Sequence, residues 1–363
     1  MQNQTIVSTR LVWHVAVLAA VILVAWLFID FSEFGRALAN AHWPWVILVM
    51  GLSTLDRFLM AGKWLQLLRY LKSTATFGAV LGAYYQVAFL ERFIPSSLTG
   101  DALRAVLIAR RFQGSSQVLA TMVVEKLVAM LAAIVLALVG LGFLLTQRYD
   151  ADQLTLFVLV PSLLVATLAG LRISLHRPFA GRVIRFLPMR LQTPLANIYD
   201  HYSSFRNAPL MLSRHFLYCV VEQTVQVLIW LTAALAIGVA TPVTTLFAVI
   251  SVAQCVRKFA MLLDGWVLGE FSMVMIGVLF GVPQTQVLAF SFLAHASAVV
   301  ASLPGVFLFS SSAIRLTEFR RARHTSGAAR QAPIFHELEL LRRRESVATR
   351  GSAQFSTGGS SRQ

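Results

Sequence analysis

The sequence predicts an all-α polytopic membrane protein with about six transmembrane helices and two broken or re-entrant helical hairpins in an inverted repeat. Its composition, its long apolar segments and an internal offset predict this class. Of 363 residues, 57% are hydrophobic and only 13% are charged, about half the usual charged share of roughly 25%. Mean hydropathy is +0.70. A soluble protein this apolar would have no polar coat, so a soluble enzyme, a disordered chain and a nucleic-acid module are excluded as descriptions of the whole chain.

Apolar segments of membrane-spanning length supply the first six elements. A hydrocarbon core of about 30 Å requires about 20 apolar residues in a helix. Six segments meet that length: Leu11–Ile29, Trp45–Leu68, Val118–Leu145, Leu154–Leu175, Leu210–Val239 and Gln286–Ala313. The first resembles a signal peptide, but no small-residue cleavage site follows it, because Asp30 and Glu33 come next. We therefore expect a retained membrane anchor.

Basic residues predict the orientation of these spans. The net charge of +15 comes from 31 Lys and Arg against 16 Asp and Glu. Seven arginines against one acid lie between Arg172 and Arg214, and ten against four glutamates follow from Arg315. The opposite loops carry only Arg36 and Arg148. Because cytoplasmic loops carry the excess of Lys and Arg, both termini are expected in the cytoplasm.

Two basic segments are not expected to span the membrane. Residues 316–363 are rich in Arg, Ser, Gly, Ala and Gln, with one possible short helix at Ile334–Arg344. We expect a mostly disordered cytoplasmic tail that touches anionic headgroups, or a solvated tail without function. The segment Pro178–Arg206 fits either an amphipathic helix on the inner leaflet or a connecting loop.

Two further apolar regions, Phe77–Arg111 and Val243–Gly281, are interrupted near their middles by breakers or small residues. An offset of 169 residues relates them, placing Gly100-Asp101 on Gly269-Glu270 and Gln117–Ala120 on the identical Gln286–Ala289. We infer repeat halves at about 77–145 and 246–313 within a transmembrane domain at 1–315. The first interrupted region starts from the cytoplasmic side and the second from the outer side, as in the inverted repeats of many transporters.

Many charged residues fall inside these apolar segments, where an ionised side chain is costly. About half of them are expected only to pair with one another and hold helices in register. Glu91-Arg92, Glu125-Lys126 and Arg257-Lys258 look partly like such structural charges. His295 is expected to be a lone histidine packed at a helix contact.

The segment from Pro95 to Arg104 carries the sharpest functional signal. Pro95 ends the preceding half-helix, Ser97 or Thr99 can cap the next one, and Gly100 allows close approach of the backbone. The free N–H groups of that second half-helix favour an anion. Arg104 adds a guanidinium that matches phosphate geometry. Asp101 is expected to orient Arg104, to cap the N–H groups of an empty site, to carry a proton, or only to stabilise the helix terminus.

The equivalent segment of the second half is chemically different. Gly269 and Glu270 take the places of Gly100 and Asp101, but Met273 takes the place of Arg104. The phosphate partner is therefore expected from the first half. Arg257 and Lys258 are possible contributors from the second half, and Glu125 and Glu270 would line the path of a headgroup.

These residues resemble a known family. Phe93-Ile94-Pro95-x-x-x-x-Gly100-Asp101-x-x-Arg104 resembles the signature of the lysylphosphatidylglycerol synthase transmembrane-region family, also called flippase-like domain proteins. Weaker similarities are Lys63-Trp64-x-x-Leu67-Leu68, Glu125-Lys126, and Gly269-Glu270 with the later Leu303-Pro304-Gly305. The resemblance covers roughly residues 10–315 and implies a bacterial or archaeal membrane protein, here placed in the bacterial inner membrane. Multidomain relatives move an aminoacylated phospholipid between leaflets. Residues 316–363 are too short and too polar to form an aminoacyltransferase domain, so lysylphosphatidylglycerol synthesis is not expected from them. The proline that is usual in the second broken helix is missing near Leu263.

The first functional hypothesis is a flippase-like lipid transporter of the cell envelope, whose partner is an anionic phospholipid or a polyprenyl-phosphate lipid. The alternatives are a membrane enzyme or an accessory subunit acting on lipid-linked substrates. An enzyme is less favoured, because no nucleophile–base pair or histidine cluster is seen. No cofactor or metal is expected: Cys219 and Cys255 have no metal spacing, and no phosphate-binding loop occurs. No nucleic-acid partner is expected, and the sequence leaves the oligomeric state open.

Overall fold

The structure of the protein is a computed structural model, and it describes most of the chain before residue 306. The described residues are 35–36, 39–90, 97–112, 114–144, 151–174, 181, 184–185, 188–262 and 266–305. The chain divides into one unit that ends at Val306 and a second that begins at Phe307. The second unit, and with it the predicted tail and its short helix, lies outside the described residues.

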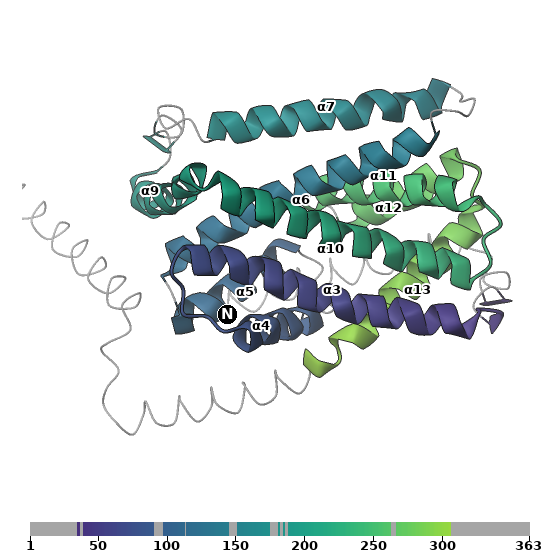
Figure 1. Ribbon diagram of the computed structural model, residues 1–363, viewed down its shortest axis with the longest axis horizontal. Coiled ribbons are helices and arrows are strands. Elements are labelled where there is room, and N and C mark those ends of the chain that lie inside the picture. The colour runs from purple at the N-terminus through teal and green to yellow at the C-terminus, as the bar shows by residue number, and fades with distance from the viewer. Residues whose placement is uncertain are drawn as a thin grey trace, which may run out of the picture. The chain divides into compact units, whose positions relative to one another are not determined.

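The described part of the first unit is built from helices, with no strand among its residues (Figure 1). The main helices are α3 (Trp43–Tyr70), α4 (Phe77–Leu90), α5 (Ser97–Phe112), α6 (Ser115–Leu144), α7 (Ala151–Ser174), α9 (Met189–Ser204), α10 (Pro209–Ala236), α11 (Val243–Leu262), α12 (Trp266–Leu279) and α13 (Gln284–Ser302), and the short 3-10 helix η1 (Phe205–Asn207) precedes α10. An all-α fold is therefore confirmed for the described residues.

Six of these helices are long and apolar enough to cross a membrane, which confirms a polytopic membrane protein. Five of them, α3, α6, α7, α10 and α13, correspond to predicted spans. The predicted span Leu11–Ile29 lies outside the described residues. The sixth long helix is α11, which the sequence placed inside an interrupted region. The interruption near the middle of that region is confirmed, because α11 ends at Leu262 and α12 begins at Trp266; the half before the break is itself 20 residues long.

The two interrupted regions each form two helices. In the first, α4 ends at Leu90 and α5 begins at Ser97. In the second, α11 ends at Leu262 and α12 begins at Trp266. The breaks, with Pro95 in one and Asp264 in the other, lie outside the described residues. Helix α9 (Met189–Ser204) lies within the segment Pro178–Arg206, for which the sequence predicted either an amphipathic helix or a connecting loop.

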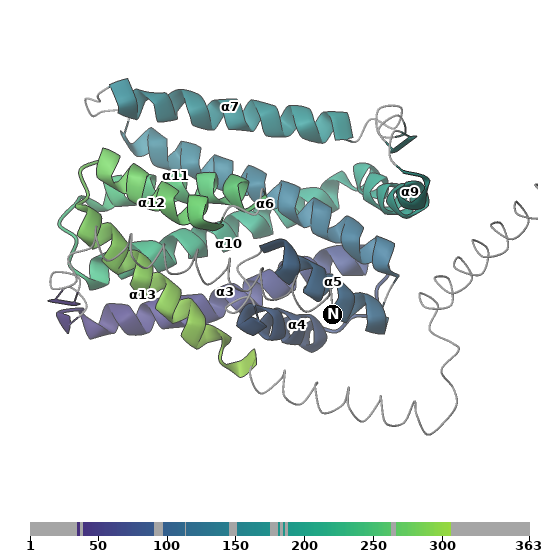
Figure 2. The same ribbon diagram turned by 180° about the vertical axis from the view of Figure 1, so that it is seen from behind.

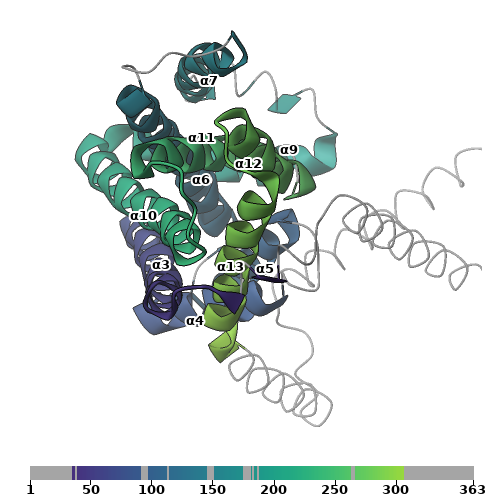
Figure 3. The same ribbon diagram turned by 90° about the vertical axis from the view of Figure 1, so that its right-hand side faces the viewer.

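Helices α3 and α10 pack side by side and run antiparallel. His42, which precedes α3, donates its backbone N–H to the carbonyl oxygen of Ala236 at the end of α10, at 2.8 Å. At the opposite end, Tyr70 packs on Phe205 with ring centroids 4.9 Å apart. Helix α6 packs along α10 and α11, and α7 packs on α6 at the edge of the unit, as Figures 1 and 3 show.

Close contact between α6 and α11 joins the two predicted repeat halves. At Gly140 of α6, a Cβ atom would lie 2.9 Å from the Cα atom of Ala248 in α11. Only glycine permits this approach of the two backbones. Around the contact lies the largest apolar core, to which α6, α10, α11 and α13 all contribute.

The helix boundaries have the spacing that the offset predicts. Helix α12 begins 169 residues after α5, and α13 begins 169 residues after α6. Helix α6 begins beside the C-terminal half of α3, whereas α13 begins at the other end, near the C-terminal half of α10. Figures 1 and 2 show α6 and α13 starting from opposite ends of the bundle. An inverted repeat remains our interpretation of this pattern.

Candidate functional site

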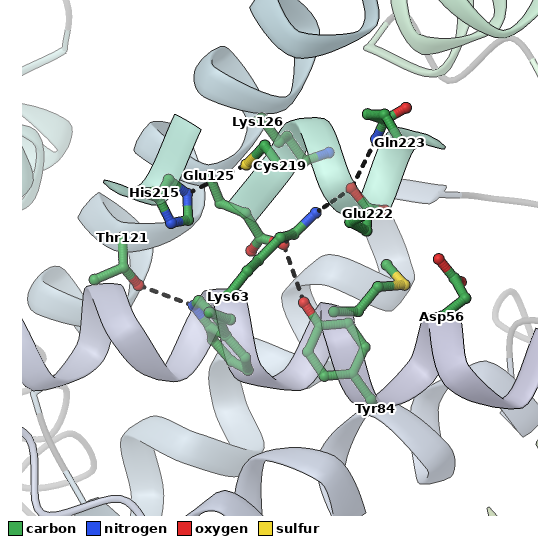
Figure 4. Close-up of polar contacts among 12 residues, drawn as sticks. Asp56, Lys63, Tyr84, Thr121, Glu125, Lys126, His215, Cys219, Glu222 and Gln223 are labelled. Atoms are coloured by element: carbon green, nitrogen blue, oxygen red, sulfur yellow. Dashed lines mark hydrogen bonds and ion pairs between the residues drawn. The ribbon is translucent and has the colours of Figure 1, made fainter. Parts of the chain in front are cut away.

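A buried ion cluster lies between α3, α6 and α10. The ammonium nitrogen of Lys63 lies 3.1 Å from Glu222 Oε2 and 3.6 Å from Glu125 Oε1. The three residues are 2%, 0% and 6% exposed, respectively. Figure 4 shows Lys63 between the two carboxylates. Since two carboxylates share one ammonium in a low-dielectric interior, removal of Lys63 would leave both without their cation.

Side-chain amides complete the surroundings of Glu222. Gln223 donates to Glu222 Oε2 at 2.8 Å, and Gln226 donates to Glu222 Oε1 at 2.6 Å. The same Gln226 amide lies 3.4 Å from Asp56 Oδ1 on α3. Lys258 of α11 is close enough to interact electrostatically with Glu222 and Asp56. The cluster therefore reaches from α6 across α3 and α10 to the second half.

Aromatic side chains form the wall between this cluster and the first broken hairpin. Tyr84 of α4 donates its hydroxyl to Glu125 Oε1 at 3.0 Å, and Trp64 donates its indole N–H to Thr121 at 3.0 Å. Arg104 lies over both rings, 4.4 Å from the centroid of Tyr84 and 5.6 Å from that of Trp64. Such cation–π contacts favour a guanidinium that has lost its water.

Asp101 connects Arg104 to α6. Its two oxygens pair with Arg104, one turn further along α5, and with Lys126 of α6. The geometry thus agrees with the expectation that Asp101 orients Arg104. The Nη1 atom of Arg104 is buried and has no hydrogen-bond partner among the described residues. One face of this guanidinium is therefore available to an additional acceptor.

A second ion cluster joins α11, α12 and α13. Glu270 lies 3.6 Å from Arg257 Nη1 and 2.8 Å from His295 Nε2. Trp230 of α10 lies against both partners, 5.1 Å from the guanidinium carbon of Arg257 and 5.3 Å between its ring and that of His295. At Gly269, a Cβ atom would lie 2.7 Å from Arg257 Cγ, so the glycine makes room for the arginine.

The structure brings most of the predicted site residues into these two clusters. Asp101, Arg104 and Glu125 lie at the first cluster, and Arg257, Lys258, Gly269 and Glu270 lie at or beside the second. Gly100 is buried in the first turns of α5. Ser97 is the first residue of α5 and Thr99 lies in its first turn, but their side chains, like Pro95, fall outside the described residues.

One pair of adjacent charges does not form a contact, and one expectation about a histidine was wrong. Glu125 pairs with Lys63 and Tyr84 and not with Lys126, because neighbouring residues on a helix do not face each other. Lys126 pairs with Asp101 instead. His295, expected to be a lone packed histidine, binds Glu270.

Four important residues were not among the predicted site residues: Lys63, Tyr84, Lys126 and Glu222. Lys63 and Glu222 did carry a signal, because each is an ionisable residue within an otherwise apolar span and requires a partner there. The sequence did not indicate which partner, since 159 residues separate the two. Tyr84 carried no signal beyond its place in an apolar helix.

The arrangement offers charge and hydrogen bonds rather than metal ligands. Within the described ranges, no group of three or more His, Cys, Asp or Glu side chains is arranged to hold a metal ion. Each cluster combines carboxylates with cations held by aromatic rings. Such a setting suits the binding of a charged headgroup in a site shielded from bulk water.

Comparison with known proteins agrees with the resemblance seen in the sequence. A protein-family model described as the lysylphosphatidylglycerol synthase TM region matches residues 11–305. No curated protein matches the chain. The matched range contains both ion clusters and every described helix.

Proposed function

The chain belongs to the lysylphosphatidylglycerol synthase transmembrane-region family, and from this premise we propose that it binds a phosphate-bearing lipid headgroup and moves it between leaflets. The family places the protein in lipid-related membrane biology. The lipid we propose is an anionic phospholipid or a polyprenyl-phosphate carrier. The acyl or prenyl chains stay in the bilayer while the headgroup crosses at the polar residues.

The observation that carries the proposal is that, within the described part of the chain, the buried guanidinium of Arg104 has an unused hydrogen-bond donor. Arg104 is 8% exposed, and its guanidinium lies over two aromatic rings and pairs with Asp101. The buried Nη1 atom has no acceptor among the described residues. An unmade hydrogen bond of a buried charged group is costly, and a phosphate oxygen would satisfy it.

The other buried charges support a polar path beside Arg104. In hydrocarbon such residues are retained chiefly where they line ion or substrate pathways. The first cluster spans α3, α4, α6 and α10, and Lys258 and Asp56 extend it toward Arg257 and Glu270. A headgroup that leaves Arg104 would meet charge partners in both halves of the protein.

We propose that the basic end of the helices faces the bacterial cytoplasm. Arg69 lies in the last turn of α3, Arg172 lies in the last turn of α7, and Arg206 and Arg214 flank the start of α10, all at one end of the bundle. Helix α13 runs toward this end. The positive-inside rule then places the C-terminus in the cytoplasm, and the predicted first span places the N-terminus there as well.

Leaflet exchange in liposomes tests the proposal. The protein is reconstituted in phosphatidylcholine vesicles with a trace of fluorescent phosphatidylglycerol, and a membrane-impermeant quencher reports which molecules reach the outer leaflet. We expect wild type to expose the inner pool and Arg104→Ala to lose most of this exchange. Arg104→Lys should recover part of this exchange, because the positive charge remains but the bidentate donor geometry of the guanidinium is lost.

Arg172→Ala is the matched control, since it removes an exposed arginine from the peripheral helix α7. It should exchange lipid as wild type does. A phosphate-free fluorescent glycolipid should move more slowly than phosphatidylglycerol. Equal exchange by Arg104→Ala and wild type, at equal amounts of folded protein, would refute the proposal. Mass spectrometry of the same vesicles would detect a lipid product and would then favour the enzyme alternative.

A further inference from the structure

A second cationic site lies outside both ion clusters, where the end of α3 meets the start of α10. A cavity of about 540 Å³ opens there, within the usual size range of small-molecule sites, roughly 300–1,000 Å³. Its lining includes Gln66, Arg69, Tyr70, Asn207 and Arg214. Figure 1 shows the end of α3 and the start of α10, with α9 next to the start of α10.

The cavity carries two positive charges and no acid. Arg69 and Arg214 are exposed, lie on different helices, and have no carboxylate partner within salt-bridge distance among the described residues. Two guanidinium groups facing one cavity repel each other unless an anion lies between them. Guanidinium groups bind phosphate oxygens through two parallel N–H donors.

The walls of the cavity are fixed by contacts of their own. Tyr70 donates its hydroxyl to the carbonyl oxygen of Ser204 at 3.2 Å and packs on Phe205, which is 2% exposed. Gln66 Oε1 accepts a hydrogen bond from Nδ1–H of His215 at 3.2 Å. His215 in turn contacts Cys219, one turn of α10 before Glu222. The cavity is therefore built on the helices that hold the buried ion cluster.

From these observations we propose that this cavity binds the phosphate group of an anion at the membrane surface. Helices α3 and α10 both have membrane-spanning length. Because α3 ends and α10 begins at the cavity, the cavity lies at the depth of lipid headgroups. Phosphate of a lipid headgroup and free phosphate share the required chemistry. The cavity would be the first place where the transported lipid contacts the protein. Only the view that the bound lipid is then transported rests on the proposed function.

Lipid binding to the purified full-length protein tests the site. Every variant is made in the Arg104→Ala background, so that the site proposed for transport does not contribute. Native mass spectrometry measures the apparent Kd for dioleoyl phosphatidylglycerol added to delipidated protein in detergent. The double variant Arg69→Gln with Arg214→Gln should bind about tenfold more weakly, and each single variant about threefold more weakly, at low ionic strength.

Arg206→Gln is the matched control, because Arg206 is an exposed arginine of η1 that does not line the cavity. It should bind within about twofold of its parent, because a side chain that does not line the cavity gives the phosphate no direct guanidinium donor. Equal weakening by Arg206→Gln, or no weakening in the double variant, would overturn the site. Dioleoylglycerol, which lacks phosphate, should bind poorly, and tight binding of it would also overturn the site.

Inorganic phosphate distinguishes the two sources of the anion. Displacement of the lipid by free phosphate supports recognition of the phosphate group alone, and persistence of the lipid supports a membrane-anchored phosphate. The two proposals fail separately. If Arg104→Ala alone exchanges lipid as wild type does while the double variant loses binding, the transport proposal falls and this site stands. If the double variant binds lipid normally while Arg104→Ala loses exchange, this site falls and the transport proposal stands.

Discussion

The two halves of the protein contain equivalent carboxylate–base pairs with different surroundings. Asp101 pairs with Lys126, and Glu270 pairs with His295; the partners are 25 residues apart in each pair. The offset of 169 places Asp101 on Glu270 and Lys126 on His295. In both halves a carboxylate of the helix after the break is thereby tied to the next helix. The equivalence of Asp101 and Glu270 is visible in the sequence, because both are acidic. That of Lys126 and His295 is not, because lysine and histidine differ in type.

The additional cation differs between the halves. Asp101 takes its second partner from its own helix, at Arg104, whereas Glu270 takes Arg257 from the preceding helix. Met273, which is 1% exposed, fills the position equivalent to Arg104. The two equivalent pairs are similarly exposed, at 18% and 35% for Asp101 and Lys126 and at 23% and 30% for Glu270 and His295. Only the first pair lies beside the nearly inaccessible cluster of Lys63, Glu125 and Glu222. The same framework thus lies next to a fully enclosed ion cluster in the first half only.

Lys63→Met should break the first cluster with the largest effect on stability. Glu125 and Glu222 would lose their shared cation in a buried site, which costs about 3–5 kcal/mol of unfolding free energy. Unfolding in mixed micelles titrated with sodium dodecyl sulfate measures the loss. Arg172→Met, an exposed change on α7, serves as the control. A Lys63→Met protein as stable as this control would contradict the described ion cluster.

Gly140→Leu should separate the two halves at the contact of α6 with α11. Its side chain would meet the Ala248 backbone, and overpacking of this kind costs about 1–3 kcal/mol. Gly142→Leu offers a matched control, because a Cβ atom there meets nothing within 4 Å. The same unfolding titration should separate the two variants. Similar stability of both would show that the halves do not pack as described.

Glu270→Gln should weaken the second cluster less than Lys63→Met weakens the first. It removes the charged acceptor of Arg257 and His295, a loss of about 1–2 kcal/mol for a partly exposed group. Comparing the unfolding free energies of the two variants tests the proposed contrast in burial. A loss for Glu270→Gln equal to that for Lys63→Met would mean that the two halves are equally enclosed.

Tyr84→Phe should have the smallest effect, about 1 kcal/mol, because it removes one hydrogen bond to Glu125 and leaves the ring under Arg104. Tyr85→Phe, the neighbouring change on α4, should leave stability unchanged. The thermal midpoint of both variants in detergent provides the measurement. If Tyr85→Phe is the more damaging change, the assigned hydrogen bond is wrong.

Much of the fold follows from the sequence. Apolar length alone predicted α3, α6, α7, α10 and α13, because the bilayer requires a nearly fixed number of apolar residues. The offset of 169 predicted the spacing of the helix starts, and breaker residues predicted the end of α4. Charge within apolar segments identified Asp101, Arg104 and Glu270. The sequence also predicted the break between α11 and α12, but it did not indicate that α11 alone is long enough to span the membrane.

The tertiary structure decided which charges meet. Lys63 and Glu222 come from helices far apart in the chain, and their contact depends on the antiparallel packing of α3 and α10. Glu125 faces Lys63 while Lys126 faces Asp101, because successive helical side chains point in different directions. Sequence determined that these charges lie within the membrane and need partners. The choice of partner, and the unsatisfied face of Arg104, depend on helix rotation and packing, which are set by long-range contacts.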